Sequence, residues 1–329
     1  MSMLKEEVLR LLRGQEKPVS GEQMSAALGV SRAAVWKAVA ALRADGYGVE
    51  ASTRLGYRLV SAPDRLDGAG VLAALGEHPW RGRVVVLESV DSTNNYLKKL
   101  AAEGAPEGTV VIADRQTAGR GRRGRTFESP SGVGVYWSVL LRPRAKPEQL
   151  LHLTALVGTA ACSAVESVCG VRPGIKWTND LVLGRHKICG ILTELSLEAE
   201  SREVDYVVSG IGINCNQTAF PEELRGMAAS LRMETGRPVD RCALAAALVR
   251  EICRMNETMF SQKEAWLRRF AGDCVTVGQD VRVVRGDVCY PAHADGIGPD
   301  GELLVTRPDG TREAINSGEV SIRGMYGYL

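Results

Sequence analysis

Residues 119–125, Gly-Arg-Gly-Arg-Arg-Gly-Arg, combine three glycines with four guanidinium groups. Glycine allows backbone conformations and close approaches that other residues do not, so such a loop can fold over a bound group. Arginine carries fixed pairs of N–H donors that match the oxygens of phosphate and carboxylate. The segment therefore predicts a loop that closes around an anionic ligand.

Other interpretations of this loop stay open at this point. Gly119, Gly121 and Gly124 have the spacing of a dinucleotide-binding fingerprint, but that motif needs an apolar helix next, and 126–130 reads Thr-Phe-Glu-Ser-Pro. An Arg/Gly tract can also bind single-stranded nucleic acid, and a run of charges is often only a solvated loop. The motifs elsewhere in the chain distinguish between these interpretations of the loop.

Further segments carry groups suited to a small polar ligand. Residues 92–94, Ser-Thr-Asn, stand at a predicted helix start, where backbone N–H groups point outward, although helix capping alone accounts for one of them. Gln116 precedes the Arg/Gly loop, and 176–180 reads Lys-Trp-Thr-Asn-Asp. Lys187 follows a hairpin turn inside an apolar strand. A lysine there is usually an exposed edge residue, but the nearby Lys-Asn-Asp cluster favours a function.

The composition indicates a globular protein of two or three domains, because the 329 residues are 45% hydrophobic and 24% charged. The net charge is only +2, so any basic surface is local. No apolar run approaches the roughly 20 residues of a membrane span, and the N-terminus lacks the features of a signal peptide. The eight cysteines form no CxxC pair and no metal-ligand cluster with the four histidines. We therefore expect a cytoplasmic protein without a membrane partner or a structural metal.

Residues 1–62 are predicted to form a winged helix-turn-helix. Helical spacing and Ser and Gly caps place helices at 4–12, 21–28 and 32–44, and two short strands follow near 49–51 and 57–60. Nine Lys and Arg against six Asp and Glu favour DNA contact, although a helical hairpin that binds protein is the alternative. The candidate DNA-binding residues are Ser31, Arg32, Ala33, Lys37 and Arg54.

The rest of the chain predicts an α+β domain and a small all-β domain. A linker is expected at 63–82, and strands and helices alternate to residue 270, which predicts helices against a mixed sheet. In this block 133–141 alternates as a strand should, and 150–168 is a long apolar helix. Residues 271–329 contain short strands separated by Asp-Gly turns, which favours a barrel of about five strands.

These motifs together resemble one known family. The order Ser-Thr-Asn, QTAGRGRRGR, KWTND, KICGIL and GIGINCN is similar to that of the biotin protein ligases, and the N-terminal domain makes the whole chain resemble the bifunctional ligases that also repress the biotin operon. Two positions depart from the pattern: Thr178 stands where proline is usual, and Phe127 where tryptophan is common. Neither change removes a charged or donor group. The resemblance implies a class II synthetase-like ligase domain, 63–270, and a C-terminal SH3-like β-barrel, 271–329.

The resemblance also implies the reaction and its residues. Biotin and ATP with Mg²⁺ would form biotinyl-5′-adenylate, and a lysine of a biotin carboxyl carrier protein would then accept the biotin. Lys187, Arg120 and Arg122 are the candidate catalytic residues, because positioned cations stabilise charge at phosphorus. The expected biotin and adenylate contacts are Ser92, Thr93, Asn94, Gln116, Gly119, Arg120, Gly121, Arg122, Lys187 and Gly190. The expected nucleotide and Mg²⁺ side comprises Lys176, Asn179, Asp180, Asn214 and Arg323.

Two alternative functions stay open: a ligase for another substrate, and a repressor that is not an enzyme. Lipoate–protein ligases share the reaction logic but lack the Arg/Gly loop and the winged helix. A ligand-responsive repressor without catalysis would have no need for Lys187. The expected partners are the carrier protein, for example a subunit of acetyl-CoA carboxylase, the biotin operator DNA, and a second copy of the chain, because paired half-sites call for a two-fold dimer.

Overall fold

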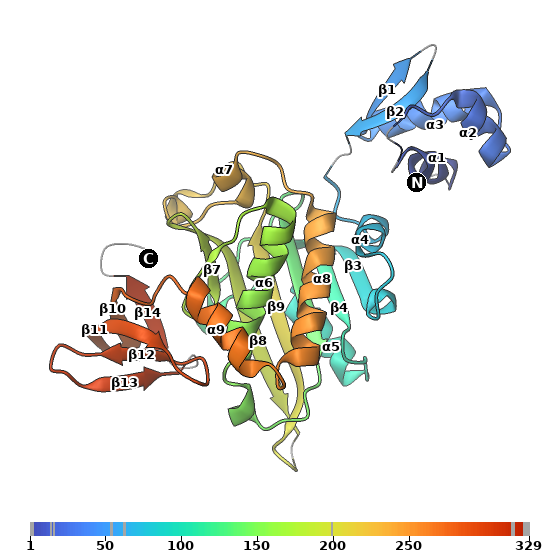
Figure 1. The fold of residues 1–329 in the computed structure, drawn as a ribbon. Helices are drawn as coiled ribbons and strands as arrows, with labels where there is room; N and C mark the ends of the chain where they lie inside the picture. The colour runs from blue at the N-terminus through green and yellow to red at the C-terminus, as the bar shows by residue number, and fades with distance from the viewer. Residues whose placement is uncertain are drawn as a thin grey trace. The chain divides into compact units, whose positions relative to one another are not determined.

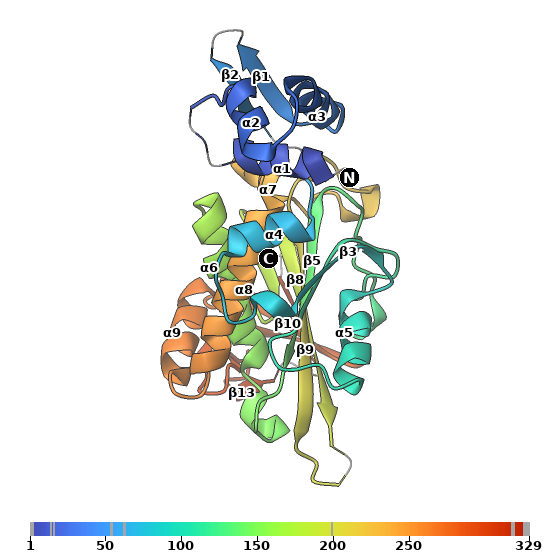
Figure 2. The same ribbon diagram turned by 90° about the vertical axis from the view of Figure 1, so that its right-hand side faces the viewer.

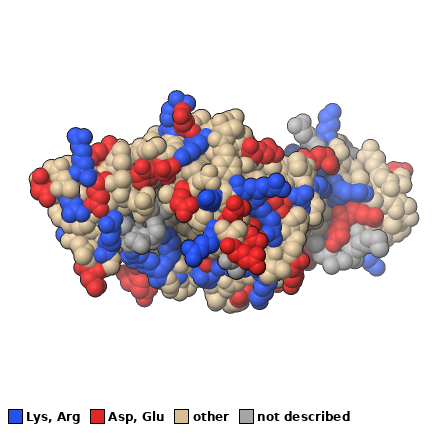
Figure 3. All heavy atoms as spheres, turned by 90° about the horizontal axis from the view of Figure 1, so that it is seen from below, with Lys and Arg blue, Asp and Glu red and all other residues tan. Residues whose placement is uncertain are grey.

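The computed structural model describes residues 3–13, 15, 17–52, 55–61, 64–198, 200–316 and 320–324 (Figure 1). The chain separates into two compact units, Met1–Asp64 and Arg65–Leu329. On the face shown in Figure 3, basic and acidic side chains are interspersed, as the small net charge predicts.

The N-terminal unit has the predicted helices and wing. Helices α1 (Met3–Leu12), α2 (Gly21–Leu28) and α3 (Arg32–Ala44) precede strands β1 (Gly48–Ser52) and β2 (Gly56–Ser61), which pair antiparallel. The Ser20 and Ser31 hydroxyls accept hydrogen bonds from Gln23 N and Ala34 N, and Gly29 ends α2 at φ 65°. These caps were predicted and are confirmed. Gly14, the predicted end of the first helix, lies outside the described residues.

A mixed sheet of seven strands forms the middle of the second unit. The strand order is β3-β4-β5-β9-β8-β7-β6, in which only β3 and β4 pair parallel. The predicted mixed sheet is therefore confirmed. The strands are β3 (Val84–Val90), β4 (Val110–Gln116), β5 (Gly134–Leu141), β6 (Gly174–Lys176), β7 (Asp180–Leu183), β8 (His186–Leu197) and β9 (Val204–Asn214).

Helices cover both faces of this sheet (Figure 2). Helices α4 (Gly68–Leu75), α6 (Leu153–Cys169), α8 (Arg241–Thr258) and α9 (Lys263–Asp273) pack on one side, and α5 (Thr93–Ala102) contacts β4, β5 and β9 on the other. The strand predicted at 133–141 is confirmed as β5, and because helices cover both faces of the sheet, all of its residues are buried rather than every second one. The short helix α7 (Leu231–Thr235) follows β9.

Two apolar segments are packed into the core of the second unit. The stretch Pro147–Cys169 is the one helix of the described residues that is long and apolar enough to cross a membrane, but most of its apolar window is buried in the core. The segment 63–82, expected as a linker, instead contains α4, whose Val71 and Leu75 are buried against the main core. Its apolar residues reach α8, a contact between segments far apart in the sequence.

The C-terminal part is a five-stranded antiparallel sheet in the order β13-β12-β11-β10-β14. Its strands are β10 (Asp280–Arg285), β11 (Val288–Ile297), β12 (Leu303–Thr306), β13 (Arg312–Ile315) and β14 (Val320–Gly324). The predicted all-β domain of about five strands is confirmed. It is anchored to the domain of the seven-stranded sheet through Trp177, whose Nε1 donates to Gly301 O at 3.0 Å and whose backbone N donates to Thr276 Oγ1 at 2.9 Å.

Candidate active site

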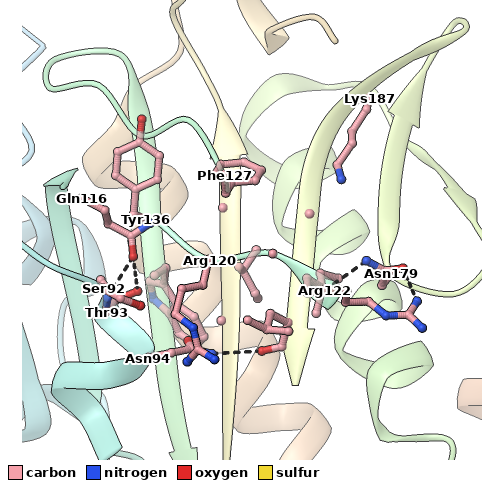
Figure 4. A pocket seen from close by; sticks show the side chains of 18 residues that line it. Ser92, Thr93, Asn94, Gln116, Arg120, Arg122, Phe127, Tyr136, Asn179 and Lys187 are labelled. Atoms are coloured by element: carbon pink, nitrogen blue, oxygen red, sulfur yellow. Dashed lines mark hydrogen bonds between the residues drawn. The ribbon is translucent and has the colours of Figure 1, made fainter. Parts of the chain in front are cut away.

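A pocket of about 500 Å³, part of it open to solvent, lies over β5, β8 and β9 and beneath the Arg/Gly loop (Figure 4). It brings together most of the side chains singled out in the sequence. The predicted residues that line it are Ser92, Thr93, Asn94, Gln116, Arg120, Gly121, Arg122, Asn179, Lys187 and Gly190.

One end of the pocket is a buried polar network at the start of α5. Thr93 donates to Gln116 Oε1 from its backbone N at 2.9 Å and from its hydroxyl at 3.1 Å. Ser138 Oγ lies 2.7 Å from Thr93 Oγ1 and 2.6 Å from Asn94 Oδ1. Ser92 is the N-cap residue, yet among the described residues its hydroxyl makes no capping bond, so capping does not account for it. Donors and acceptors with fixed positions suit a planar polar group.

The bottom of the pocket includes two glycines of β9, Gly210 and Gly212, which were not among the predicted site residues. A Cβ atom on Gly210 would lie 2.2 Å from Asn94 Oδ1, and one on Gly212 would lie 2.6 Å from the Phe127 ring. Only glycine therefore allows this close approach of side chains to the sheet. The GIGINCN motif was the available signal, although it does not by itself say what faces these glycines.

Aromatic and apolar side chains complete this surface. Phe127 lies over Gly212 and packs edge-on against Tyr136, with ring centroids 6.4 Å apart. The lining residues that the sequence analysis left out of the predicted site are Phe127, Tyr136, Trp137, Ile191, Leu192, Gly210, Ile211 and Gly212. Such a surface suits the apolar part of a small ligand.

Charged groups gather at the other end of the pocket. Lys187 Nζ lies 2.7 Å from Asp180 Oδ1, and Arg122 donates to Asn179 Oδ1 at 2.8 Å. Burial lowers the pKa of Arg122 from its ordinary value, against the attraction of Asp180. Lys187 stands on β8, between β7 and β9, so the interpretation of this lysine as an edge residue is wrong. Two cations beside a polar pocket suit a carboxylate or a phosphate.

The Arg/Gly loop is tied to the sheet through Arg120. Its guanidinium donates to Asn95 Oδ1 at 2.9 Å and lies 3.1 Å from Glu194 Oε1. Glu194 also accepts from Asn94 Nδ2 at 2.9 Å and from Lys98 Nζ at 2.6 Å. Burial acts to raise the pKa of Glu194, but these hydrogen bonds and the charges of Lys98 and Arg120 outweigh it and lower the pKa below its ordinary value.

Four other predicted residues do not line the pocket: Gly119, Lys176, Asp180 and Asn214. Gly119 O accepts a hydrogen bond from Phe127 N at 3.0 Å. Lys176 stands opposite Asp180 in the antiparallel register of β6 and β7. Asn214 is buried, where it donates to Ala229 O at 3.2 Å. Arg54 lies outside the described residues, as does the side chain of Arg323.

A second hollow adjoins the pocket and shares Arg122, Asn179, Ile191 and Leu192 with it. Asn316, the residue that follows β13, lines this hollow, so the C-terminal part of the chain reaches the neighbourhood of the charged end. Within the described ranges, no group of three or more His, Cys, Asp or Glu side chains could hold a metal ion.

The fold and the site together define a ligase domain with an attached helix-turn-helix. Three family models match the chain: the Biotin/lipoate A/B protein ligase family at 86–214, an HTH domain at 5–58, and the Biotin protein ligase C terminal domain at 276–323.

Relatives that match over nearly their whole length are also named as ligases with a repressor function. The Bifunctional ligase/repressor BirA of Bacillus subtilis is 34% identical over 91% of this chain and 92% of its own length. The Escherichia coli protein of that name is 33% identical, with 92% of each chain covered. A solved biotin protein ligase from Aquifex aeolicus, in complex with biotin and ATP, is 30% identical, with a TM-score of 0.64, over 74% of this chain and 99% of its own. The chain belongs to the BirA family of bifunctional ligase/repressors, the biotin protein ligases that carry a DNA-binding domain.

Proposed function

We propose that this protein joins biotin to ATP, giving biotinyl-5′-adenylate and pyrophosphate, and then transfers biotin to a lysine of a biotin carboxyl carrier protein. The observation that carries the proposal is the pocket itself. It has a polar end for a ureido ring, an apolar middle, and a charged end at Lys187 and Arg122.

The first step needs charge stabilisation and alignment. A carboxylate oxygen of biotin attacks the α-phosphorus of ATP, the bond to the β-phosphate oxygen breaks, and pyrophosphate leaves. Lys187 would hold the biotin carboxylate beside the α-phosphate, and Arg122 would offset the negative charge at phosphorus. Mg²⁺ enters with ATP as substrate, and the oxygens of Asn179 and Asp180 are suited to contact it, because Mg²⁺ commonly takes one or two protein oxygens besides phosphate and water.

The second step needs the adenylate to survive until the carrier arrives. The carrier lysine attacks the carbonyl carbon of the mixed anhydride, an amide bond forms, and AMP leaves. The loop residues Gly119, Arg120 and Gly121 would cover the adenylate and keep water from hydrolysing it. Gly190 is proposed as a contact of biotin and its adenylate. Asn214, Lys176 and Arg323 are proposed as contacts on the nucleotide side. Relatives named as biotin–acetyl-CoA-carboxylase ligases suggest a subunit of acetyl-CoA carboxylase as the carrier. The reaction is proposed to take place in the cytoplasm.

The decisive test is pyrophosphate release with Lys187→Ala. We expect adenylation to fall by about 10²–10³-fold, the typical cost of losing a positioned charge-stabilising group. Lys99→Ala, an exposed lysine on α5, is the matched control and should stay near wild type. Normal adenylation by a well-folded Lys187→Ala protein would contradict the assignment. Release with lipoate instead of biotin would favour a lipoate ligase, and no release with either would favour a repressor without catalysis.

For the N-terminal unit we propose adenylate-dependent binding to operator DNA as a homodimer. Ser31, Arg32, Ala33 and Lys37 are exposed on α3, while Val35, Val39 and Leu42 hold its other face in the core. By thermodynamic linkage, DNA must tighten adenylate binding by the factor by which the adenylate tightens DNA binding.

Fluorescence anisotropy at fixed salt tests this second function. DNA affinity should rise when wild-type protein is saturated with the adenylate, and Arg32→Ala should weaken DNA binding while biotin transfer stays intact. Equal DNA affinity with and without the adenylate would refute the linked repressor function.

A further inference from the structure

Trp36 is exceptional among the tryptophans of this chain. Its exposed fraction is 60%, whereas the other four, Trp80, Trp137, Trp177 and Trp266, are all at most 6% exposed. A single exposed apolar residue is ordinary on a protein surface. Trp36 is notable for its position on helix α3, beside residues suited to contact DNA.

Trp36 is the fifth residue of α3, the second helix of the helix-turn-helix. It lies one helical turn after Arg32 and Ala33 and next to Lys37, and these residues are exposed. The residues that face the core are Val35, Ala38, Val39 and Leu42. Trp36 therefore shares the solvent face with the first turn of the helix, and the N-terminal part of the second helix is the part that enters the major groove in proteins of this class.

Charge on the helix favours DNA over a protein as the occupant of this face. Helix α3 contains Arg32, Lys37 and Arg43 and no acidic residue. Arg43 donates to Val49 O at 2.9 Å and 2.6 Å, so it supports the wing, while Arg32 and Lys37 stand on either side of Trp36 along the chain. The cations are suited to contact the phosphates of DNA, and the exposed aromatic ring between them is suited to contact a base edge.

We propose that Trp36 reads the operator by apolar contact of its indole ring with the 5-methyl group of a thymine in the major groove. This inference rests on the DNA-binding function proposed above and names a residue and a base that carry its specificity. Thymine is the base that presents a methyl group in the major groove, and apolar side chains are the groups that recognise it. Arg32 and Lys37 would contribute phosphate contacts, which orient the helix but do not read sequence.

The probe for the test is a duplex selected from a random library by wild-type protein in the presence of biotin and MgATP. Each thymine is then replaced by deoxyuridine, which removes only the methyl group. For wild-type protein, one position in each half-site should lose about fourfold in affinity, the effect of one buried methyl. Trp36→Ala should bind the parent duplex about tenfold or more weakly and be insensitive to that replacement.

Arg32→Ala is the matched control. It should weaken binding to all duplexes, reduce the salt dependence, and keep the sensitivity to the thymine methyl. A Trp36→Ala protein that keeps this sensitivity would overturn the proposal. Failure of the wild type to select any duplex would remove the DNA-binding function as well, so the two failures are distinguishable.

Acrylamide quenching of wild-type fluorescence gives a second readout that needs no substitution. Because the other tryptophans are buried, the quenchable emission comes mainly from Trp36. Saturating the protein with the selected duplex should sharply reduce quenching. Undiminished quenching in the saturated complex would overturn the proposal, and protection by carrier protein instead of DNA would do the same by assigning the face to a protein partner.

Discussion

The ion pair between Arg120 and Glu194 offers a direct test of the proposal that the Arg/Gly loop holds the adenylate. Arg120 is the loop residue whose guanidinium reaches both α5, through Asn95, and β8, through Glu194. Glu194→Gln removes the negative charge while keeping the size of the side chain. If the pair holds the loop over the ligand, this change should let the adenylate escape faster.

The structure sets the size of this effect. A hydrogen bond to a charged group contributes about 1.5–3 kcal/mol when it is shielded, but exposed ion pairs contribute about 0–1 kcal/mol. The side chain of Glu194 is 19% exposed and that of Arg120 is 43% exposed, so the pair belongs near the boundary of these ranges. We expect about 1 kcal/mol, or about a fivefold faster release of adenylate.

The assay is a double-mutant cycle on adenylate release. Labelled adenylate is formed on the enzyme, chased with unlabelled ligand, and followed for wild type, Arg120→Ala, Glu194→Gln and the double variant. Coupling between Arg120 and Glu194 should make the double variant release no faster than Arg120→Ala alone. Lys98→Met is the control, because it removes the 2.6 Å contact of Lys98 with Glu194 without touching the loop. Additive effects of Arg120→Ala and Glu194→Gln would refute the reasoning.

Two further predictions concern stability and the pocket floor. Burial lowers the pKa of His152 from 6.5 to about 4. Between pH 6.5 and pH 4 the unfolded chain therefore binds a proton at His152 that the folded protein does not. The free energy of unfolding consequently falls by about 3 kcal/mol as the pH drops through this range. Urea midpoints of His152→Leu should lose this pH dependence, and an unchanged slope would contradict it. Gly210→Ala should raise the KM for biotin strongly, because the new Cβ meets Asn94. Gly82 has open space around it, so Gly82→Ala is the control and should leave the KM unchanged. Equal KM values for the two variants would refute the role of Gly210.

Local signals in the sequence were enough for much of the fold. The helix starts at Ser20 and Ser31 and the hairpin before Lys187 depend on caps and turns, which act over a few residues, and the structure has all of them. The linker prediction failed because α4 is held by its contact with α8. Such a contact joins segments separated by more than a hundred residues, and no local pattern encodes it.

The candidate site shows the same limit. The motifs predicted the residues that carry charge or hydrogen-bonding groups, and most of these line one pocket. Gly210 and Gly212 were left out because their role is to admit Asn94 and Phe127, which come from distant segments. Glu194 was missed for a similar reason. Its partners Asn94, Lys98 and Arg120 meet it only after α5 and the loop pack against β8.

The departures at Thr178 and Phe127 leave the charged end of the site in place, for physical reasons. Thr178 is buried, and the segment around it is held by Trp177, which donates to Gly301 O and Thr276 Oγ1 of the C-terminal part. Asn179 and Asp180 are further fixed from outside the segment by Arg122 and Lys187. A proline at 178 would restrict the backbone locally, whereas here the neighbouring contacts supply the restriction.

Phe127 in turn has its ring fixed between Gly212 and Tyr136. The pocket therefore keeps an aromatic wall at the position where tryptophan is common, although phenylalanine lacks the indole N–H. Thr93 of α5 and Gln116 of β4 form hydrogen bonds to each other without a donor from residue 127. If the ligand's polar end binds there, as proposed, its recognition does not need an indole N–H at position 127. Ligand selectivity in this protein should accordingly depend on Gln116 more than on Phe127.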